Sequence, residues 1–339
     1  MAAPALERPT TTTSGTQTVT IAKALNMGLR ASLERDPKVL VMGEDVGKLG
    51  GVFRITDGLQ KDFGEHRVLD TPLAESGIIG TAVGLAIRGY RPVCEIQFDG
   101  FIFPGFDQIV SQLAKLHFRS QGKLKMPVVI RVPFGGGIGA VEHHSESPEA
   151  FFAHIGGLKV VSCSNPVDAY WMLQQAIECD DPVLFFEPKR RYYEKAELDP
   201  STPPVPLFSS RVVRPGSAVT VAAYGPMVRT CLDAATAAAE DDLDIEVVDL
   251  RTLSPLDLDP VFDSVRRTGR LVLVSEAPSE ASVTSEVATR VQQECFYSLE
   301  APVLRATGFD TPYPPSKLEE GFLPDLDRVL DAVDRSLAY

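Results

Sequence analysis

The sequence predicts an α/β protein of two domains, each built around a largely parallel sheet. From Val19 onward, helix-like amphipathic runs alternate with short apolar runs, the pattern of layered α/β folds. The chain has 339 residues, more than the roughly 250–300 at which a single core stops growing. Between Pro188 and Pro215 the periodicity disappears and prolines accumulate, which indicates a domain boundary.

The expected domains follow from these shifts in composition. Residues 1–16 are rich in Ala, Pro and Thr, so we expect a disordered tail there. Residues 17–190 should form a doubly wound N-terminal domain and residues 216–339 a smaller C-terminal α/β domain. Residues 191–215 should be a linker without core elements.

The individual elements follow in order along the chain. Short apolar runs bounded by turn residues predict strands, and longer amphipathic runs predict helices. In the N-terminal domain we expect strands at 39–42, 68–69, 92–98, 127–132, 159–161 and 183–187, and helices at 20–35, 77–88, 106–119 and 166–178. In the C-terminal domain we expect strands at 218–223, 245–249, 270–275 and 303–306, and helices at 226–240, 259–268 and 282–295.

Composition excludes several classes of protein. A formal charge of −13 and a pI near 4.9 argue against nucleic acid or an anionic membrane as partner and permit a basic protein partner. The five cysteines are scattered and form no C-x-x-C pair, so neither a disulfide framework nor a zinc site is indicated, and we expect a cytoplasmic location. No apolar stretch approaches the ~20 residues that span a bilayer.

One carboxylate stands among small and apolar residues in the stretch 70–84. Pro72 disfavours helical backbone at the preceding residue, so a helix should begin between Pro72 and Ser76, with Glu75 at its electropositive end. Glycines at 77, 80 and 84 leave one helix face almost bare, which suits close packing. Glu75 is therefore either a partner of the helix dipole or a buried acid with raised proton affinity.

A glycine-rich loop follows the strand expected at 127–132. Residues 135–140 fit the G-x-G-x-x-A dinucleotide fingerprint, but neither the helix nor the acid that the fingerprint requires comes after them. A loop that presents His143 and His144 is the better interpretation, and a histidine there is either a catalytic candidate or simply packed or solvated. Adjacent histidines point different ways, so joint metal ligation is not expected.

Two further runs lie at expected strand ends, where α/β sheets bind ligands. Residues 99–106 hold three aromatic residues and could line a site or pack the core. The turn at 43–47 carries two acids that could face a ligand or cap the next segment. No G-x-S-x-G, H-E-x-x-H or Walker motif occurs.

The chain resembles the beta subunits of thiamine diphosphate-dependent 2-oxo-acid dehydrogenases. The matching runs are 43–47, 70–75, 89–92, 95–98, 106–108, 144–147, 157–161, 249–253 and 275–277. The resemblance implies a pyrimidine-binding N-terminal domain and a C-terminal domain like that of transketolase.

The resemblance also implies roles for single residues. Glu75 matches the glutamate that hydrogen-bonds the cofactor's aminopyrimidine ring and favours its imino form. Phe101 matches an aromatic position against that ring, and Leu73 and Gln97 match other pocket positions. His144 matches an active-site histidine for substrate binding or proton handling, whereas His143 receives no role.

No Gly-Asp-Gly motif, the usual start of the diphosphate and Mg²⁺ site, occurs in this chain. The resemblance thus implies an alpha subunit that holds the diphosphate and Mg²⁺, an α2β2 heterotetramer, and an isolated chain that is inactive. We expect no metal site on this chain. Some relatives bind K⁺ near positions matching Val128, Val129 and Asp181, but Met126 and Cys179 depart from that pattern, so a K⁺ site stays open.

In such enzymes the C-terminal domain mediates assembly and docks the lipoyl-bearing acyltransferase core, whose basic docking domain an acidic chain would suit. Residues 147–154 and 186–189 look more like members that act on branched-chain 2-oxo acids than like pyruvate or acetoin dehydrogenases. We therefore expect oxidative decarboxylation of branched-chain 2-oxo acids with acyl transfer to a lipoyl group. The alternatives are a pyruvate or acetoin dehydrogenase subunit and a non-catalytic assembly subunit.

Overall fold

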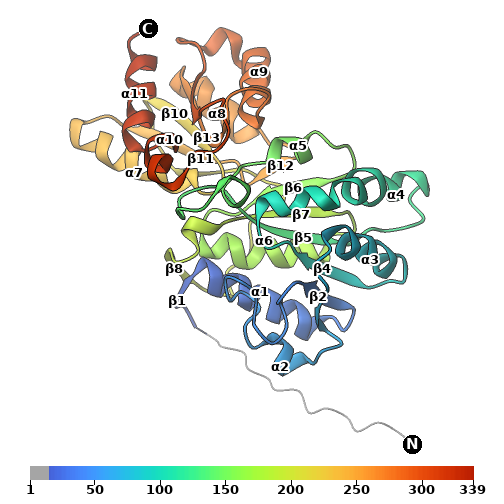
Figure 1. The fold of residues 1–339 in the computed structure, drawn as a ribbon. Coiled ribbons are helices and arrows are strands. Elements are labelled where there is room, and N and C mark those ends of the chain that lie inside the picture. Colours follow the sequence, from blue (N-terminus) through green and yellow to red (C-terminus); the bar gives the residue numbers. More distant parts are fainter. Residues whose placement is uncertain (1–14) are drawn as a thin grey trace, which may run out of the picture.

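A computed structural model describes residues 15–339, and it has the expected two-domain α/β fold. Figure 1 shows the C-terminal domain, coloured yellow to red, stacked on the N-terminal domain, coloured blue to green. The predicted tail at 1–16 falls outside the described residues except for its last two positions. The expected domain ranges stay a prediction.

The N-terminal sheet has seven strands in the order β12-β6-β7-β5-β4-β2-β3. All neighbours pair in parallel except β12, which runs antiparallel at one edge. The strands are β2 (Val39–Gly43), β3 (Val68–Asp70), β4 (Arg91–Glu95), β5 (Val129–Phe134), β6 (Lys159–Ser162), β7 (Val183–Pro188) and β12 (Thr252–Ser254). Six of them begin within two residues of the expected positions, because continuous β-branched runs mark strands buried on both faces.

Alternate residues of these strands supply two separate cores. On one face, Val129, Phe185 and their neighbours pack against α1 (Ile21–Arg35) and α6 (Pro166–Glu178). On the other face, Ile130 and Phe186 pack against α3 (Glu75–Ile87), η2 (Gln108–Leu113), a π-helix, and α4 (Ala114–Arg119). The shorter α2 (Leu59–Phe63) and α5 (Glu149–Ala153) complete this domain.

The C-terminal sheet has five strands in the order β14-β13-β10-β11-β9, antiparallel only at β9. The strands are β9 (Arg211–Arg214), β10 (Val219–Ala223), β11 (Ile245–Asp249), β13 (Leu271–Pro278) and β14 (Leu304–Gly308). The helices are α7 (Met227–Ala238), α8 (Asp259–Thr268), α9 (Val283–Cys295), α10 (Glu319–Phe322) and α11 (Leu326–Leu337).

Residues 191–215 differ from the expected linker without core elements. They contain β8 (Lys195–Leu198), which pairs antiparallel with β1 (Gln17–Thr20), and β9, which extends the C-terminal sheet. Four of the prolines that suggested a linker lie between these two strands, and Pro215 directly follows β9. The expectation was wrong there because edge strands tolerate irregular flanking sequence and carry little hydrophobic periodicity.

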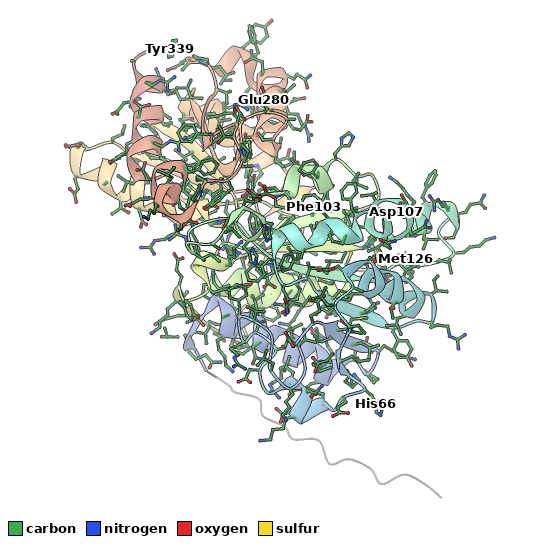
Figure 2. The ribbon with its side chains drawn as sticks, viewed as in Figure 1. His66, Phe103, Asp107, Met126, Glu280 and Tyr339 are labelled. Carbon is green, nitrogen blue, oxygen red and sulfur yellow. The ribbon has the colours of Figure 1, made fainter. Side chains whose placement is uncertain are left out.

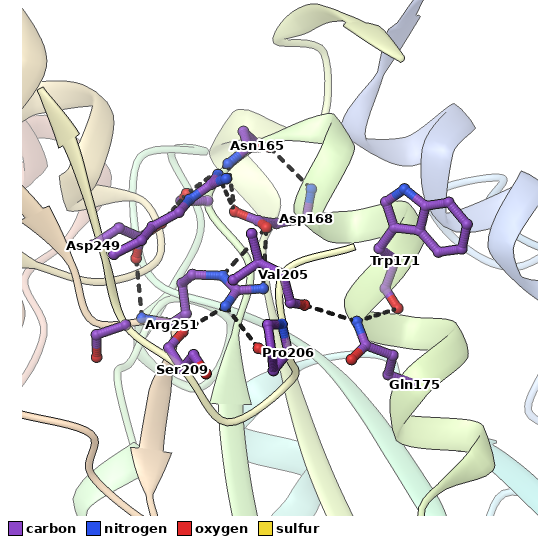
Figure 3. A network of polar contacts seen from close by, with 12 residues as sticks. Asn165, Asp168, Trp171, Gln175, Val205, Pro206, Ser209, Asp249 and Arg251 are labelled. Atoms are coloured by element: carbon purple, nitrogen blue, oxygen red, sulfur yellow. Dashed lines mark hydrogen bonds and ion pairs between the residues drawn. The ribbon is translucent and has the colours of Figure 1, made fainter. Parts of the chain in front are cut away.

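A buried arginine ties the two domains together (Figure 3). Arg251 follows β11, and its Nε lies 3.2 Å from Oδ1 of Asp168 in α6. Its Nη1 donates to the carbonyl of Pro206 at 3.0 Å, and its backbone N–H donates to Asp249 at 3.0 Å. Because Arg251 is fully buried, these contacts replace the water that its charge would otherwise require.

A second contact across the domains joins Glu149 of α5 to Tyr224, which follows β10. The Tyr224 hydroxyl donates to the Glu149 carboxylate, and both side chains are buried. Burial raises the pKa of Glu149 to about 7.

Among the described residues, no helix is long and apolar enough to cross a membrane.

Figure 2 places Glu280 and Tyr339 on the C-terminal domain, at the end of the molecule opposite His66.

Replacing Glu149 with Gln should flatten the pH dependence of folding stability. The folded chain keeps a proton on Glu149 up to about pH 7, whereas the unfolded chain loses it near the usual 4.5. Stability should therefore fall as pH rises through this window, and Glu149→Gln should remove up to about 3 kcal/mol of that fall. Urea unfolding of the full chain near both ends of the window measures it.

The matched control is Glu240→Gln, because Glu240 is an exposed carboxylate just beyond α7. It should keep the wild-type pH dependence. An unchanged slope in Glu149→Gln would contradict the prediction.

Candidate active site at the carboxyl edge of the N-terminal sheet

Two carboxylates lie near each other at the carboxyl ends of β2 and β3. Glu75 is the first residue of α3 and is buried, and Glu44 directly follows β2 and is also buried. Burial raises the pKa of Glu44, and the charges of Glu75 and Asp45 add to the effect. Glu44 Oε1 is buried without a hydrogen-bond partner in the described part of the chain. Proximity of two acids favours proton uptake by one of them.

The start of α3 lies where the sequence predicted it, between Pro72 and Ser76. Ala74 is the N-cap residue and supplies no side-chain hydrogen bond to the helix. The Glu75 carboxylate is thus placed at the positive end of the helix dipole.

Gln97 lies beside this pair of acids. Its Nε2 is 3.4 Å from both the Glu44 carbonyl oxygen and Asp45 Oδ2, which makes two weak hydrogen bonds. It follows β4, which ends at Glu95 rather than at 98 as the sequence suggested. Three residues separate the end of β4 from η1 (Asp99–Gly105), a 3-10 helix.

Aromatic rings of η1 and its flank surround His144. The His144 ring centroid lies 4.2 Å from that of Phe98 and 5.1 Å from that of Phe101. Burial lowers the pKa of His144, and the charge of His143 lowers it further, so the ring is neutral at neutral pH. Its Nδ1 is buried without a hydrogen-bond partner among residues 15–339. His143 is exposed.

Glycine at position 100 permits this packing. A Cβ added there would lie 2.5 Å from the carbonyl oxygen of His143, closer than atoms can approach. The turn η3 (Glu142–His144) therefore rests directly on η1.

A buried ion pair fixes η1 beneath the histidine. Asp99 Oδ1 lies 2.7 Å from Lys189 Nζ, and neither side chain is exposed. Asp99 Oδ2 accepts the backbone N–H of Glu146 at 2.7 Å. One carboxylate thus joins η1, the residue after β7 and the segment that carries His144.

The other end of η1 reaches the start of α3. A Cβ at Gly105 would lie 3.4 Å from the carbonyl oxygen of Glu75, so the two backbones are in close contact. Through η1, the structure gathers Glu75, Gln97, Phe101 and His144 at one edge of the sheet. Leu73 differs, because its side chain is 81% exposed and contacts little of this chain.

The bare face of α3 is not covered by the described residues. Gly84 has open space where a side chain would project, and the nearest atom to a Cβ at Gly80 is Gln108 Cγ at 3.9 Å. Gly77, Gly80 and Gly84 are all exposed. The sequence left open whether this face packs within the chain or against another chain, and the described residues of this chain leave it uncovered.

The glycine loop at 135–139 is not free to bind a dinucleotide phosphate. Its Gly136 N–H donates to Glu276, and the N–H groups of Gly137 and Gly139 donate to Glu319. The chain's own carboxylates take the place that a phosphate would need.

The residues present fit a flat, polar heteroaromatic group such as an aminopyrimidine. They offer a carboxylate at Glu75, the unpartnered Glu44 Oε1 and His144 Nδ1, and the ring of Phe101. Among the described residues, no group of three or more His, Cys, Asp or Glu side chains could hold a metal ion. Asp181 pairs with His117 at 2.6 Å and with Lys159 at 3.8 Å.

The sequence marked Glu44 only as one of two acids that could face a ligand, and it did not single out Asp99 or Lys189. An acid directly after a buried strand was a usable signal for Glu44. Nothing local marks Asp99 and Lys189 as partners, because ninety residues separate them.

Comparison with known proteins identifies both domains. Residues 17–195 match the model of the transketolase pyrimidine-binding domain, and residues 209–329 match that of the transketolase C-terminal domain. A solved structure described as a split-gene transketolase, inactive beta4 tetramer, superposes with a TM-score of 0.79 over 94% of this chain and 98% of that one. Its sequence identity is 22%, so it supports the fold alone.

Several relatives match over nearly the whole chain. A pyruvate dehydrogenase E1 component subunit beta from Leifsonia xyli is 61% identical over 99% of both chains. A 3-methyl-2-oxobutanoate dehydrogenase subunit beta from Mycobacterium tuberculosis is 54% identical over 95% of this chain and 93% of its own. A 2-oxoisovalerate dehydrogenase subunit beta from Pseudomonas aeruginosa is 46% identical over 94% of both chains.

Proposed function

The chain belongs to the beta subunits of the thiamine diphosphate-dependent 2-oxo-acid dehydrogenases, and we propose that it supplies the pyrimidine-activating half of their active site. The observation that carries the proposal is the juxtaposition of Glu75 with Glu44, at the edge where η1 also brings Phe101 and His144. When bound, the cofactor supplies the carbanion chemistry of 2-oxo-acid decarboxylation.

Each residue has a defined part in this proposal. Glu75 would hold the aminopyrimidine ring through its carboxylate, which burial shields from water. Phe101 would pack against that ring, and Gln97 would line the same pocket. His144, held neutral by burial, offers Nδ1 to the substrate or to a proton in transfer. Leu73 belongs to the pocket only if another chain covers it, since it is exposed here.

The need for another chain to cover Leu73 supports an active site shared with an alpha subunit. The chain has no Gly-Asp-Gly motif, so we assign the diphosphate and Mg²⁺ to the alpha subunit of an α2β2 heterotetramer. The uncovered glycine face of α3 beside Glu75 is consistent with contact to another chain. The proposal includes no K⁺ site on this chain, because Asp181 is already paired with His117 and Lys159.

For the substrate we propose branched-chain 2-oxo acids, with acyl transfer to a lipoyl group. The support is the similarity of residues 147–154 and 186–189 to branched-chain members, together with the 54% and 46% identical relatives named for branched substrates. Pyruvate is the second candidate, favoured by the 61% identical relative.

We further propose that the C-terminal domain docks the basic domain of a lipoyl acyltransferase core. The chain's charge of −13 supports this partner. A cytoplasmic location remains a prediction.

Replacing Glu75 with Gln should abolish most activity of the complex reconstituted with an alpha subunit. The amide cannot exchange a proton with the aminopyrimidine, so kcat should fall by roughly 10²–10⁴-fold. Steady-state turnover measures the loss, and sedimentation should show unchanged assembly.

Glu65→Gln is the matched control, because Glu65 is an exposed carboxylate before β3. It should leave turnover unchanged. Full activity in Glu75→Gln would defeat the cofactor assignment and favour the non-catalytic assembly subunit.

The reconstituted complex should prefer branched-chain 2-oxo acids over pyruvate in kcat/KM. Competition between the two substrates in one reaction measures the ratio directly. A ratio in favour of pyruvate would replace the proposed substrate by the second candidate.

Binding of the basic docking domain should weaken as salt rises, since the proposed contact is between opposite charges. Calorimetric titration of the heterotetramer at increasing ionic strength measures the dependence. Affinity that is independent of salt would contradict a charge-based docking surface.

A further inference from the structure

The glycine loop ahead of His144 is held by carboxylates that come from the C-terminal domain. Gly137 N–H donates to Glu319 Oε1 and Gly139 N–H to Glu319 Oε2, each at 2.8 Å. Gly136 N–H donates to Glu276 Oε2 at 2.9 Å. Both carboxylates are buried. Successive backbone N–H groups that converge on one carboxylate form an anion-binding concavity, here filled from within the chain.

Glu319 is itself fixed in place. It is the first residue of α10, and its Oε1 also accepts the hydroxyl of Tyr313 at 2.6 Å. Although burial acts to raise it, the pKa of Glu319 is lowered by the hydrogen bonds from Tyr313, Gly137 and Gly139. The carboxylate therefore stays ionised, which strengthens the hydrogen bonds that it accepts.

The glycine loop lies so close to its neighbours that side chains at Gly136 and Gly137 would collide with them. A Cβ at Gly136 would lie 1.9 Å from the Tyr313 hydroxyl oxygen, and one at Gly137 would lie 2.6 Å from Arg190 Cδ. Gly137 and Gly139 also have φ of 88° and 70°, which L side chains rarely adopt. Glycine is thus required here by close contacts with Tyr313, Arg190 and Glu319. Nucleotide binding is not needed to explain these glycines.

His144 lies between two points at which carboxylates hold its segment, and we call these two contacts the anchors. Glu319 holds the loop at Gly137 and Gly139, and Asp99 holds it at the N–H of Glu146. Between the two anchors, Glu142 and His143 are exposed. The placement of His144 against Phe98 and Phe101 therefore depends on both anchors.

We propose that Glu319 is a positioning residue for the reaction: it ties the loop that carries His144 to the C-terminal domain and so sets the direction of the His144 ring. This inference rests on the proposed function, in which His144 meets the substrate. Glu319 contacts no substrate itself and acts only through the loop.

The test compares Glu319→Gln with Glu320→Gln in the complex reconstituted with an alpha subunit. Gln presents an NH₂ group to one of the glycine N–H donors, so that hydrogen bond is lost. We expect kcat to fall by roughly ten- to a hundredfold, as for misplaced catalytic groups. KM for the 2-oxo acid should change by less than about threefold, since uniform binding is retained.

Glu320 is the matched control, because it is the exposed neighbour on the same short helix. Its replacement should leave kcat and KM at the wild-type values. Glu319→Asp keeps the charge with a shorter reach and should restore part of the lost kcat.

Hydrogen exchange of residues 136–146 gives a readout that does not depend on activity. The segment should exchange faster in Glu319→Gln than in the wild type, with exchange elsewhere unchanged. Unchanged loop exchange would overturn the inference, as would faster loop exchange with wild-type kcat. If Glu319→Gln does not fold, the same two outcomes in Glu319→Asp decide.

His144→Ala separates this inference from the proposed function. Wild-type turnover in His144→Ala would remove His144 from the site, and the positioning role would fall with it. Strongly reduced turnover in His144→Ala together with wild-type turnover in Glu319→Gln would overturn the positioning role alone.

Discussion

The buried ion pair between Asp99 and Lys189 is the contact on which the candidate site depends. Burial raises the pKa of Asp99 and lowers that of Lys189, so each charge is stabilised chiefly by the other. Such a pair survives without water only when its geometry is good and its remaining atoms are hydrogen-bonded. Here the separation is 2.7 Å, and the second oxygen of Asp99 accepts the N–H of Glu146. Loss of either partner would leave an uncompensated charge beneath both η1 and the His144 segment.

Lys189 also begins a short segment that reaches into the other domain. The next residue, Arg190, pairs with Glu276 at 2.6 Å, and Arg191 donates to the Pro226 carbonyl at 3.2 Å. Three consecutive basic residues, 189–191, therefore connect the Asp99 carboxylate with β13 and the start of α7. Together with the carboxylates that hold the glycine loop, they make the C-terminal domain part of the scaffold of the site.

The Asp99–Lys189 pair and the C-terminal domain support the candidate site, whereas its side at α3 is open. Glu44 Oε1 and His144 Nδ1 are buried without hydrogen-bond partners among the described residues, which also leave the glycine face of α3 near Glu75 uncovered. Natural proteins bury few polar atoms without partners, so such atoms gathered at one edge indicate a ligand. An exposed Leu73 beside that edge points in the same direction, because a large apolar side chain gains from being covered. These features support the proposal that this chain binds its cofactor together with another subunit.

The sequence by itself determined the place and type of most of the longer elements, but it did not predict α11 or the edge strands β8, β9 and β12. Side-chain period decides whether a run such as 127–132 or 166–178 forms a strand or a helix, so most bounds agree within two residues. It also placed Glu75 at a helix start, because the effect of Pro72 on the backbone is local. The family resemblance came from short runs such as 43–47 and 70–75, which are also local in the sequence.

Only the tertiary structure decided which distant residues meet. It added β12 to the N-terminal sheet and joined Asp99 to Lys189 and the glycine loop to Glu276 and Glu319. The last two partners lie 140 and 182 residues along the chain from the glycines that they hold. No local pattern encodes such pairs, because each depends on how two domains pack after their own elements have formed. Glu75 and His144 could thus be named as candidate residues from the sequence, whereas the contacts that hold the segment around His144 could not.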